Sequence, residues 1–120
     1  MRKQYYFRAS PRGRLAWDVD RLVRLTRDFP RKHIPLHTIP ELDQPWPSAP
    51  TWRDVIAHLQ LIEAADLTHP IILSASGEIM DGRHRVAKAV LLGLRDIDAV
   101  QFGEDPEPDY VGREPDELPY

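Results

Sequence analysis

The residue types best suited to chemistry stand together in one short run, Asp81-Gly-Arg-His-Arg85. Strand-like residues 78–80 precede this run, and residues 86–93 carry apolar side chains at helical spacing up to a glycine stop. The pattern predicts a strand, a sharp corner and a helix. The first N–H groups of a helix have no partner within it and lie at the positive end of its dipole. The corner is therefore predicted to bind an anion such as a phosphate group.

Each residue of the corner has an expected role. Asp81 is expected to cap the first amides of the helix, and Gly82 to let the backbone approach a neighbour closely. Arg83 and Arg85 lie in the first turn, where positive charge is unfavourable for the helix alone, so the two cations indicate an anionic ligand. The alternative is structural: both arginines are solvated or paired with carboxylates, and His84 packs against the sheet.

Further motifs flank the corner. An Ala-rich helix, Leu-Gly and the strand Ile97-Asp-Ala-Val100 follow it, and the strand His69-Pro-Ile-Ile-Leu73 precedes it. In this order the motifs resemble the ParB/sulfiredoxin superfamily, over residues 34–102. The resemblance implies an α+β fold with a small mixed β-sheet flanked by helices. It also implies a nucleotide (ATP, ADP or CTP) with Mg²⁺, bound at the phosphate-binding residues Asp81, Gly82, Arg83, His84 and Arg85.

Two residues are candidates for catalysis of phosphoryl transfer or nucleotide hydrolysis. In the kinase-like branch of the superfamily, an acid just after the first core strand activates an acceptor hydroxyl. The resemblance implies this role for Glu41, with Asp43 behind it; the alternative is a solvated loop carboxylate. His84 is the second candidate because the corner fixes its position, although it can equally brace the turn through hydrogen bonds.

Two differences from the superfamily limit the functions that the resemblance implies. Sulfiredoxins place a reactive cysteine at the position that Arg83 occupies here, so sulfiredoxin activity is excluded. Chromosome-partition ParB proteins read Gly-Glu-Arg-Arg at the corner and continue into a helix-turn-helix domain, whereas this chain has His84 between its arginines and then an acidic segment. Two other function classes stay open: a non-enzymatic, DNA-associated relative and a protein-interaction module.

Charge is divided unevenly along the 120 residues. Residues 1–33, a basic arm and helix, hold ten Lys or Arg against three Asp, whereas the remaining residues hold six against sixteen. The basic segment can contact DNA phosphates, or it can fold onto the acidic remainder. Residues 34–102 form the predicted ParB/sulfiredoxin-like domain. Residues 103–120 form an acidic, proline-rich tail, which is not expected to fold unaided and is a candidate for joining two copies as a homodimer.

Composition excludes several classes of site. The sequence has no cysteine, which excludes disulfides, thiolate metal sites and thiol catalysis, and is typical of a cytoplasmic protein. The five histidines show no metal-like spacing, so no protein metal site is predicted. No apolar run is long enough to span a membrane, and the N-terminal residues lack the apolar segment of a signal peptide, so no membrane partner is expected.

Turn and capping signals predict the elements around the corner. A helix is expected from Asp18 or Asp20 to about residue 28, followed by an edge strand over residues 33–39. Residues 41–50 are expected to form a proline-stiffened loop that lies over the site as a wall or lid. A second helix is expected to begin with a capping box formed by Thr51 and Asp54. Its predicted apolar stripe consists of Trp52, Val55, Ile56, Leu59 and Ile62.

Overall fold

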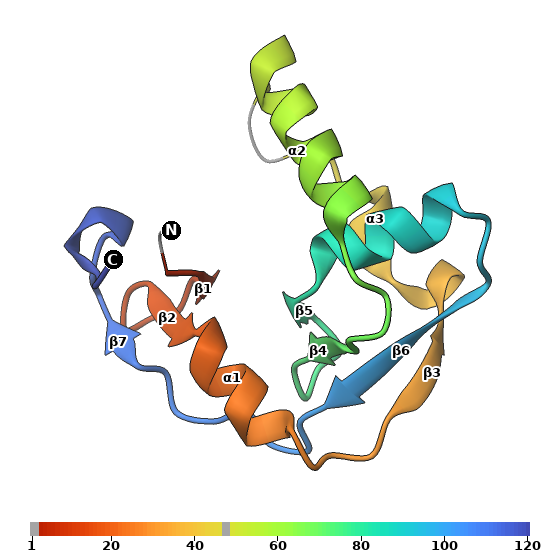
Figure 1. Cartoon of the computed structure of the whole chain (residues 1–120). Coiled ribbons are helices and arrows are strands. Elements are labelled where there is room, and N and C mark those ends of the chain that lie inside the picture. Colours follow the sequence, from red (N-terminus) through yellow and green to blue (C-terminus); the bar gives the residue numbers. More distant parts are fainter. Residues whose placement is uncertain (1–2, 47–48) are drawn as a thin grey trace.

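The computed structural model describes residues 3–46 and 49–120, which form an α+β fold with two small sheets and three α-helices. The α-helices are α1 (Val19–Thr26), α2 (Trp52–Ala64) and α3 (Arg83–Leu91), and the 3-10 helices are η1 (Leu36–Thr38), η2 (Pro40–Asp43) and η3 (Pro115–Glu117). The strands are β1 (Tyr5–Arg8), β2 (Leu15–Asp18), β3 (Lys32–Pro35), β4 (Ile71–Leu73), β5 (Ile79–Asp81), β6 (Asp96–Gln101) and β7 (Tyr110–Val111). Figure 1 shows their arrangement.

The central sheet is mixed, with strand order β3-β6-β4-β5. β4 runs parallel to β6, whereas β3 is antiparallel to β6 and β5 is antiparallel to β4. The edge position expected for residues 33–39 is confirmed, but the strand ends at Pro35 and the chain continues as η1. The N–H of Leu36 still donates to the carbonyl of Arg95 at 2.8 Å, and the chain then turns into η1.

Both faces of the central sheet are buried. All three residues of β4 are buried, and their side chains alternate between the two faces because successive residues of a strand point to opposite sides. One core cluster lies on the α3 side and contains Leu36, Ile39, Ile71, Leu73, Ile79, Val86, Ala89, Ile97 and Ala99. The other lies on the α1 side and contains Tyr6, Leu15, Trp17, Leu22, Ile72, Met80, Val100 and Phe102.

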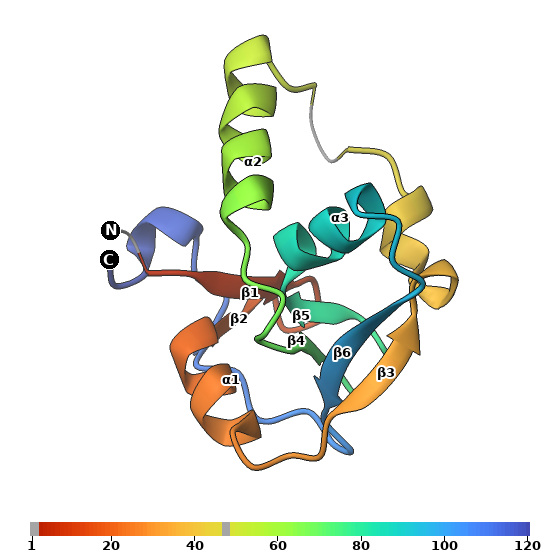
Figure 2. The ribbon, with the colours of Figure 1, turned by 45° about the vertical axis from the view of Figure 1, so that its right-hand side comes forward.

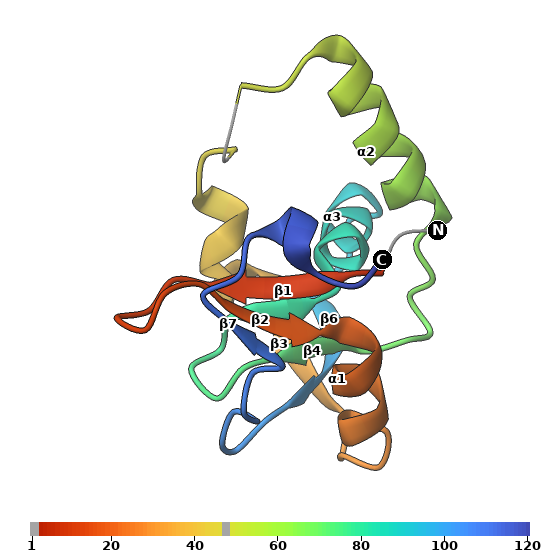
Figure 3. The same cartoon turned by 90° about the vertical axis from the view of Figure 1, so that its left-hand side faces the viewer.

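A second sheet, antiparallel with strand order β1-β2-β7, covers the α1 side. Figure 3 shows it in front of the central sheet. The sequence predicts one small mixed sheet, and the second sheet is not anticipated by it. Its third strand, β7, comes from residues 103–120, which lie against β2 and bury Leu118.

Ion pairs join the basic start of the chain to its acidic last segment. The indole N–H of Trp17 donates to the carbonyl of Pro106 at 2.8 Å, which adds a polar contact between the same two segments. The N···O distances of the ion pairs are 3.0 Å for Arg8–Asp105, 3.5 Å for Arg14–Glu114 and 3.3 Å for Arg21–Asp109. These pairs show the basic start of the chain folded onto its acidic last segment, one of the two alternatives that the charge pattern leaves open.

Local signals set the helix ends. Asp18, one of the two residues at which the sequence predicts the start of this helix, caps α1 by accepting the N–H of Asp20. The predicted capping box of α2 is confirmed, because the side chains of Thr51 and Asp54 each accept the other's backbone N–H. Gly93, with φ of +74°, follows the last turn of α3, where a residue with a side chain would be strained.

α2 stands away from the rest of the molecule, as Figure 2 shows. None of its thirteen described residues is buried. Its neighbours include α3, where the ammonium group of Lys88 donates to the carbonyls of Glu63 and Ala65 at 2.8 Å. Among the described helices, none has the length and apolar content that a membrane span requires.

Candidate functional site

The corner between β5 and α3 is shaped by close packing against β4. Gly82 has φ of +114°, and a Cβ atom built on it would lie 2.5 Å from Cγ2 of Ile71. No side chain with a Cβ fits there without movement, so the glycine is required by this contact. The expected close approach of the backbone at Gly82 is thus confirmed, with Ile71 as the neighbour.

Asp81 does not cap α3, and that expectation is wrong. The N-cap residue is Gly82, and no side chain caps the helix. The Asp81 carboxylate instead accepts from the guanidinium of Arg85, with Nη2 and Oδ2 3.0 Å apart. The helix begins at Arg83 with Gly82 as its N-cap, so Asp81, the last residue of β5, lies one position too early to cap it. The first amides of α3 are therefore left without a side-chain partner.

The two corner arginines have different environments. The Arg85 side chain is about four-fifths buried beside Asp81, and its Nε is buried with no hydrogen-bond partner among the described residues. Arg83 is exposed and lines a cavity. The structural alternative for the corner fits both arginines, because Arg85 is paired with Asp81 and Arg83 is exposed, but Arg83 also lines the cavity.

The cavity has a volume of about 630 Å³ and lies between η2 with its following loop, α2 and α3. Glu41 and His84, the two predicted catalytic residues, both line it, although they are 43 positions apart in the sequence. The Glu41 carboxylate accepts the N–H of Ile79 at 2.8 Å, which ties η2 to the start of β5. The predicted site residues that line the cavity are Glu41, Arg83 and His84, whereas Asp81, Gly82 and Arg85 do not.

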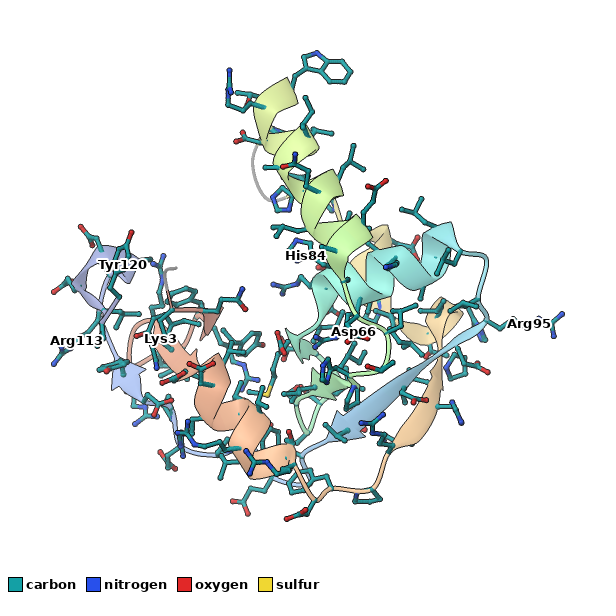
Figure 4. All side chains as sticks on the ribbon, in the orientation of Figure 1. Lys3, Asp66, His84, Arg95, Arg113 and Tyr120 are labelled. Carbon is teal, nitrogen blue, oxygen red and sulfur yellow. The ribbon has the colours of Figure 1, made fainter. Side chains whose placement is uncertain are left out.

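His84 contacts a second histidine, His58, for which the sequence predicts no role in the site. Nε2 of His84 lies 3.2 Å from Nδ1 of His58 on α2, so one ring donates a hydrogen bond to the other. In Figure 4 His84 lies where the start of α3 meets α2. Residues 55, 58 and 62 share one face of α2 by helical spacing, and this periodicity is the signal that could have placed His58 inward.

The pKa of His84 is lowered from its ordinary value of 6.5. The largest cause is burial, followed by the charges of His58, Arg83 and Arg85, and the carboxylate of Asp81 opposes the shift. The imidazole is therefore neutral at neutral pH, and a neutral imidazole can accept a proton.

Trp46 forms part of the cavity wall from the loop that follows η2. Its ring stands edge-on to His58, with centroids 4.8 Å apart and an angle of 85° between the planes. The expected wall over the site is thus present at residues 44–46, while residues 47 and 48 of the predicted loop lie outside the described part of the chain. The side chain is about half exposed, which leaves room for a ligand to pack against it.

No group of three or more His, Cys, Asp or Glu side chains among residues 3–46 and 49–120 is arranged to hold a metal ion. Comparisons of the chain with protein-family models, with curated proteins and with solved structures find no match. The chemistry of the cavity therefore has to be inferred from its own residues.

Proposed function

We propose that the protein binds a nucleotide in the cavity between η2, α2 and α3. The observation that carries this proposal is the convergence of Glu41, Arg83 and His84, predicted from two distant segments, on one cavity of about 630 Å³. Small-molecule and cofactor sites have volumes in this range and combine apolar walls with a few polar groups. The cavity has both, with Ile62 and Val86 among its apolar residues.

The residues of the cavity suit the two parts of a nucleotide. Arg83 and the first amides of α3, which no side chain caps, would bind phosphate oxygens through charge-assisted hydrogen bonds. Trp46 would stack on the base, a contact worth about 1–3 kcal/mol. Because Arg85 is paired with Asp81, the phosphate role that the sequence assigns to two arginines falls to Arg83.

Phosphoryl transfer or nucleotide hydrolysis is the finer form of the proposal. His84, neutral because its pKa is lowered, would take the proton of an attacking hydroxyl or water as the terminal phosphoryl group leaves the nucleotide. Glu41 is the second candidate base. Mg²⁺ would be held mainly by the phosphates, since it needs only one or two carboxylates from a protein, and Glu41 lines the cavity.

Membership of the ParB/sulfiredoxin superfamily belongs to the same proposal. The residues that carry the resemblance fold in the order β4, β5, α3 and β6, with β4 and β6 parallel and adjacent, which supports it. Within that superfamily reading, the nucleotide site would correspond to the start of α3.

The proposal is tested by thermal unfolding of the protein with ATP, ADP and CTP, each with and without Mg²⁺. At least one nucleotide should raise the melting temperature, because a ligand that binds only the folded state stabilises it. Arg83→Ala should abolish this rise. Arg24→Ala, which removes an exposed arginine of α1 far from the cavity, should leave it unchanged.

An unchanged melting temperature with every nucleotide would overturn the proposal. A rise that survives Arg83→Ala would show binding at another place. Release of inorganic phosphate from a nucleotide that binds, and its loss in His84→Gln, would establish turnover separately from binding.

A further inference from the structure

His58 on α2 is held between two other rings that line the cavity. Its ring meets that of Trp46 edge-on, with centroids 4.8 Å apart. Its centroid also lies 5.5 Å from that of His84, and its Nδ1 is 3.2 Å from Nε2 of His84. Lys88 of α3 holds the end of the same helix through two backbone carbonyls. These contacts position the His58 ring, although no residue of α2 is buried.

The hydrogen bond between the two histidines uses one nitrogen of each ring. It occupies Nε2 of His84, so Nδ1 is the nitrogen of His84 that remains for a ligand in the cavity. A neutral imidazole has one N–H and one bare nitrogen, so one ring donates and the other accepts. The distance between the two nitrogens suits either direction, but the two directions leave Nδ1 of His84 in opposite states.

The direction of this bond decides what His84 can do. If His58 donates, the single proton of His84 sits on Nδ1, and the ring can only donate to a ligand. If His84 donates through Nε2, its Nδ1 is bare and can accept a proton. The role of His84 as a base requires the second arrangement.

We propose that His58 is a positioning residue, which accepts the Nε2–H of His84 and thereby keeps Nδ1 of His84 bare to take the proton of the attacking water or hydroxyl. This inference rests on the proposed function and adds the residue that orients its base. Catalytic bases that activate a nucleophile are commonly oriented by such a third group.

The charges around the two rings limit them to one added proton. The pKa of His84 is lowered by burial and then by the charges of His58, Arg83 and Arg85, against the opposing charge of Asp81. While His58 is neutral, a proton taken up at Nδ1 of His84 makes the bond to His58 charge-assisted and about twice as strong. A protonated His58 would repel that charge and offer no acceptor. His84 therefore works as a base only while His58 is neutral.

NMR of the imidazole nitrogens in the whole chain, without nucleotide, tests the pairing directly. Above neutral pH, proton–nitrogen correlation spectra should show the His84 proton on Nε2. His58→Phe keeps a ring beside Trp46 and removes the acceptor, so the form of His84 protonated on Nδ1 should appear. His58→Asn should keep the original form, because its amide oxygen is bonded to Cγ, as Nδ1 of histidine is. His37→Phe, at an exposed histidine outside the cavity, is the matched control and should leave His84 unchanged.

Phosphate release tests the consequence for the reaction. With a nucleotide that raises the melting temperature, His58→Phe should keep this rise and slow phosphate release by about tenfold or more. His58→Asn should restore most of the rate, which a merely structural loss would not allow. Far-UV circular dichroism of each variant checks that it is folded.

Two NMR results would overturn the proposal: a His84 proton on Nδ1 in the original protein, or one that stays on Nε2 alone in His58→Phe. Phosphate release by His58→Phe at the original rate would overturn it as well. Absence of a nucleotide effect or of phosphate release in the original protein counts against the proposed function, and the NMR result still decides the pairing.

Discussion

Basic side chains have different surroundings on the two sides of the central sheet. On the α1 side, basic residues from the start of the chain meet acidic residues from its last segment, as in the pairs Arg8–Asp105 and Arg21–Asp109. On the α3 side, Arg83 faces a cavity and the first amides of α3 have no capping side chain. The first arrangement neutralises charge within the molecule, whereas the second leaves positive charge available to a ligand.

Three arginines show what this difference means for a single residue type. Arg8 lies 4.9 Å from the ring centroid of Trp17 and 3.0 Å from Asp105, so packing and an ion pair hold its guanidinium. Arg85 is held by Asp81 at the corner. Only the exposed Arg83 faces the cavity among these three. We expect the first two to contribute mainly to stability and the third to binding.

The largest effect is expected from Arg8→Ala. The change removes a cation that lies over Trp17 and leaves the carboxylate of Asp105, about four-fifths buried, without its ion-pair partner. We expect a loss of about 3 kcal/mol in the free energy of unfolding. Urea denaturation followed by circular dichroism measures it.

The matched control is Arg24→Ala on the exposed side of α1, which should change the free energy of unfolding by less than about 0.5 kcal/mol. If Arg8→Ala costs no more than this control, the charge pairing on the α1 side contributes nothing to stability. The contrast between the two sides would then disappear.

The next effect separates the two arginines of the corner. Arg85→Ala leaves Asp81 partly buried without its ion pair and should lower the free energy of unfolding by about 2 kcal/mol. It should keep the rise in melting temperature caused by a nucleotide. Arg83→Ala should do the reverse, with stability within about 0.5 kcal/mol of the original and the nucleotide effect lost. Equal behaviour of the two variants in both measurements would contradict the division.

A smaller effect is expected at the start of α2. Thr51→Ala removes half of a capping box and should cost about 1 kcal/mol locally. Because no residue of α2 is buried, the loss should appear as faster amide hydrogen exchange across residues 52–64. Gln60→Ala, at an exposed position of the same helix, should leave exchange near the original rate. A global loss of stability in Thr51→Ala would mean that α2 is more firmly packed than its exposure indicates.

Local sequence signals predict the starts of α1 and α2 and the four strands of the central sheet, although β3 ends earlier than expected. Asp18, Thr51 with Asp54, and Gly93 each act through backbone groups within a few residues, so spacing alone is sufficient to place them. The pairing of β7 with β2 depends on residues almost 100 positions apart, and composition alone indicates only an unfolded acidic tail. The second sheet could not be predicted for that reason.

The candidate site, too, can be predicted from the sequence only in part. Glu41 and His84 are predicted one by one, and the cavity that joins them depends on how η2, α2 and α3 pack. The run at the corner gives no means of telling Arg83 from Arg85, because the orientation of each depends on where the helix begins. A start at Arg83 rather than one residue earlier turns Arg85 toward Asp81 and makes Gly82 the cap.

The smallest effect is expected in the pH dependence that His84 contributes. Burial, with the charges of His58, Arg83 and Arg85, lowers the pKa of His84 in the folded protein below its ordinary 6.5, against the opposing charge of Asp81. As the pH falls through 6.5, the imidazole of the unfolded chain binds a proton that the folded protein does not yet bind. The free energy of unfolding therefore decreases. His84→Gln removes this contribution, so its stability should fall less than that of the original protein between about pH 7 and about pH 5. His37→Gln, at an exposed histidine outside the cavity, should follow the original profile. If His84→Gln and the original protein lose stability in parallel, the imidazole is not held neutral by its surroundings, and its assignment as a base loses its physical ground.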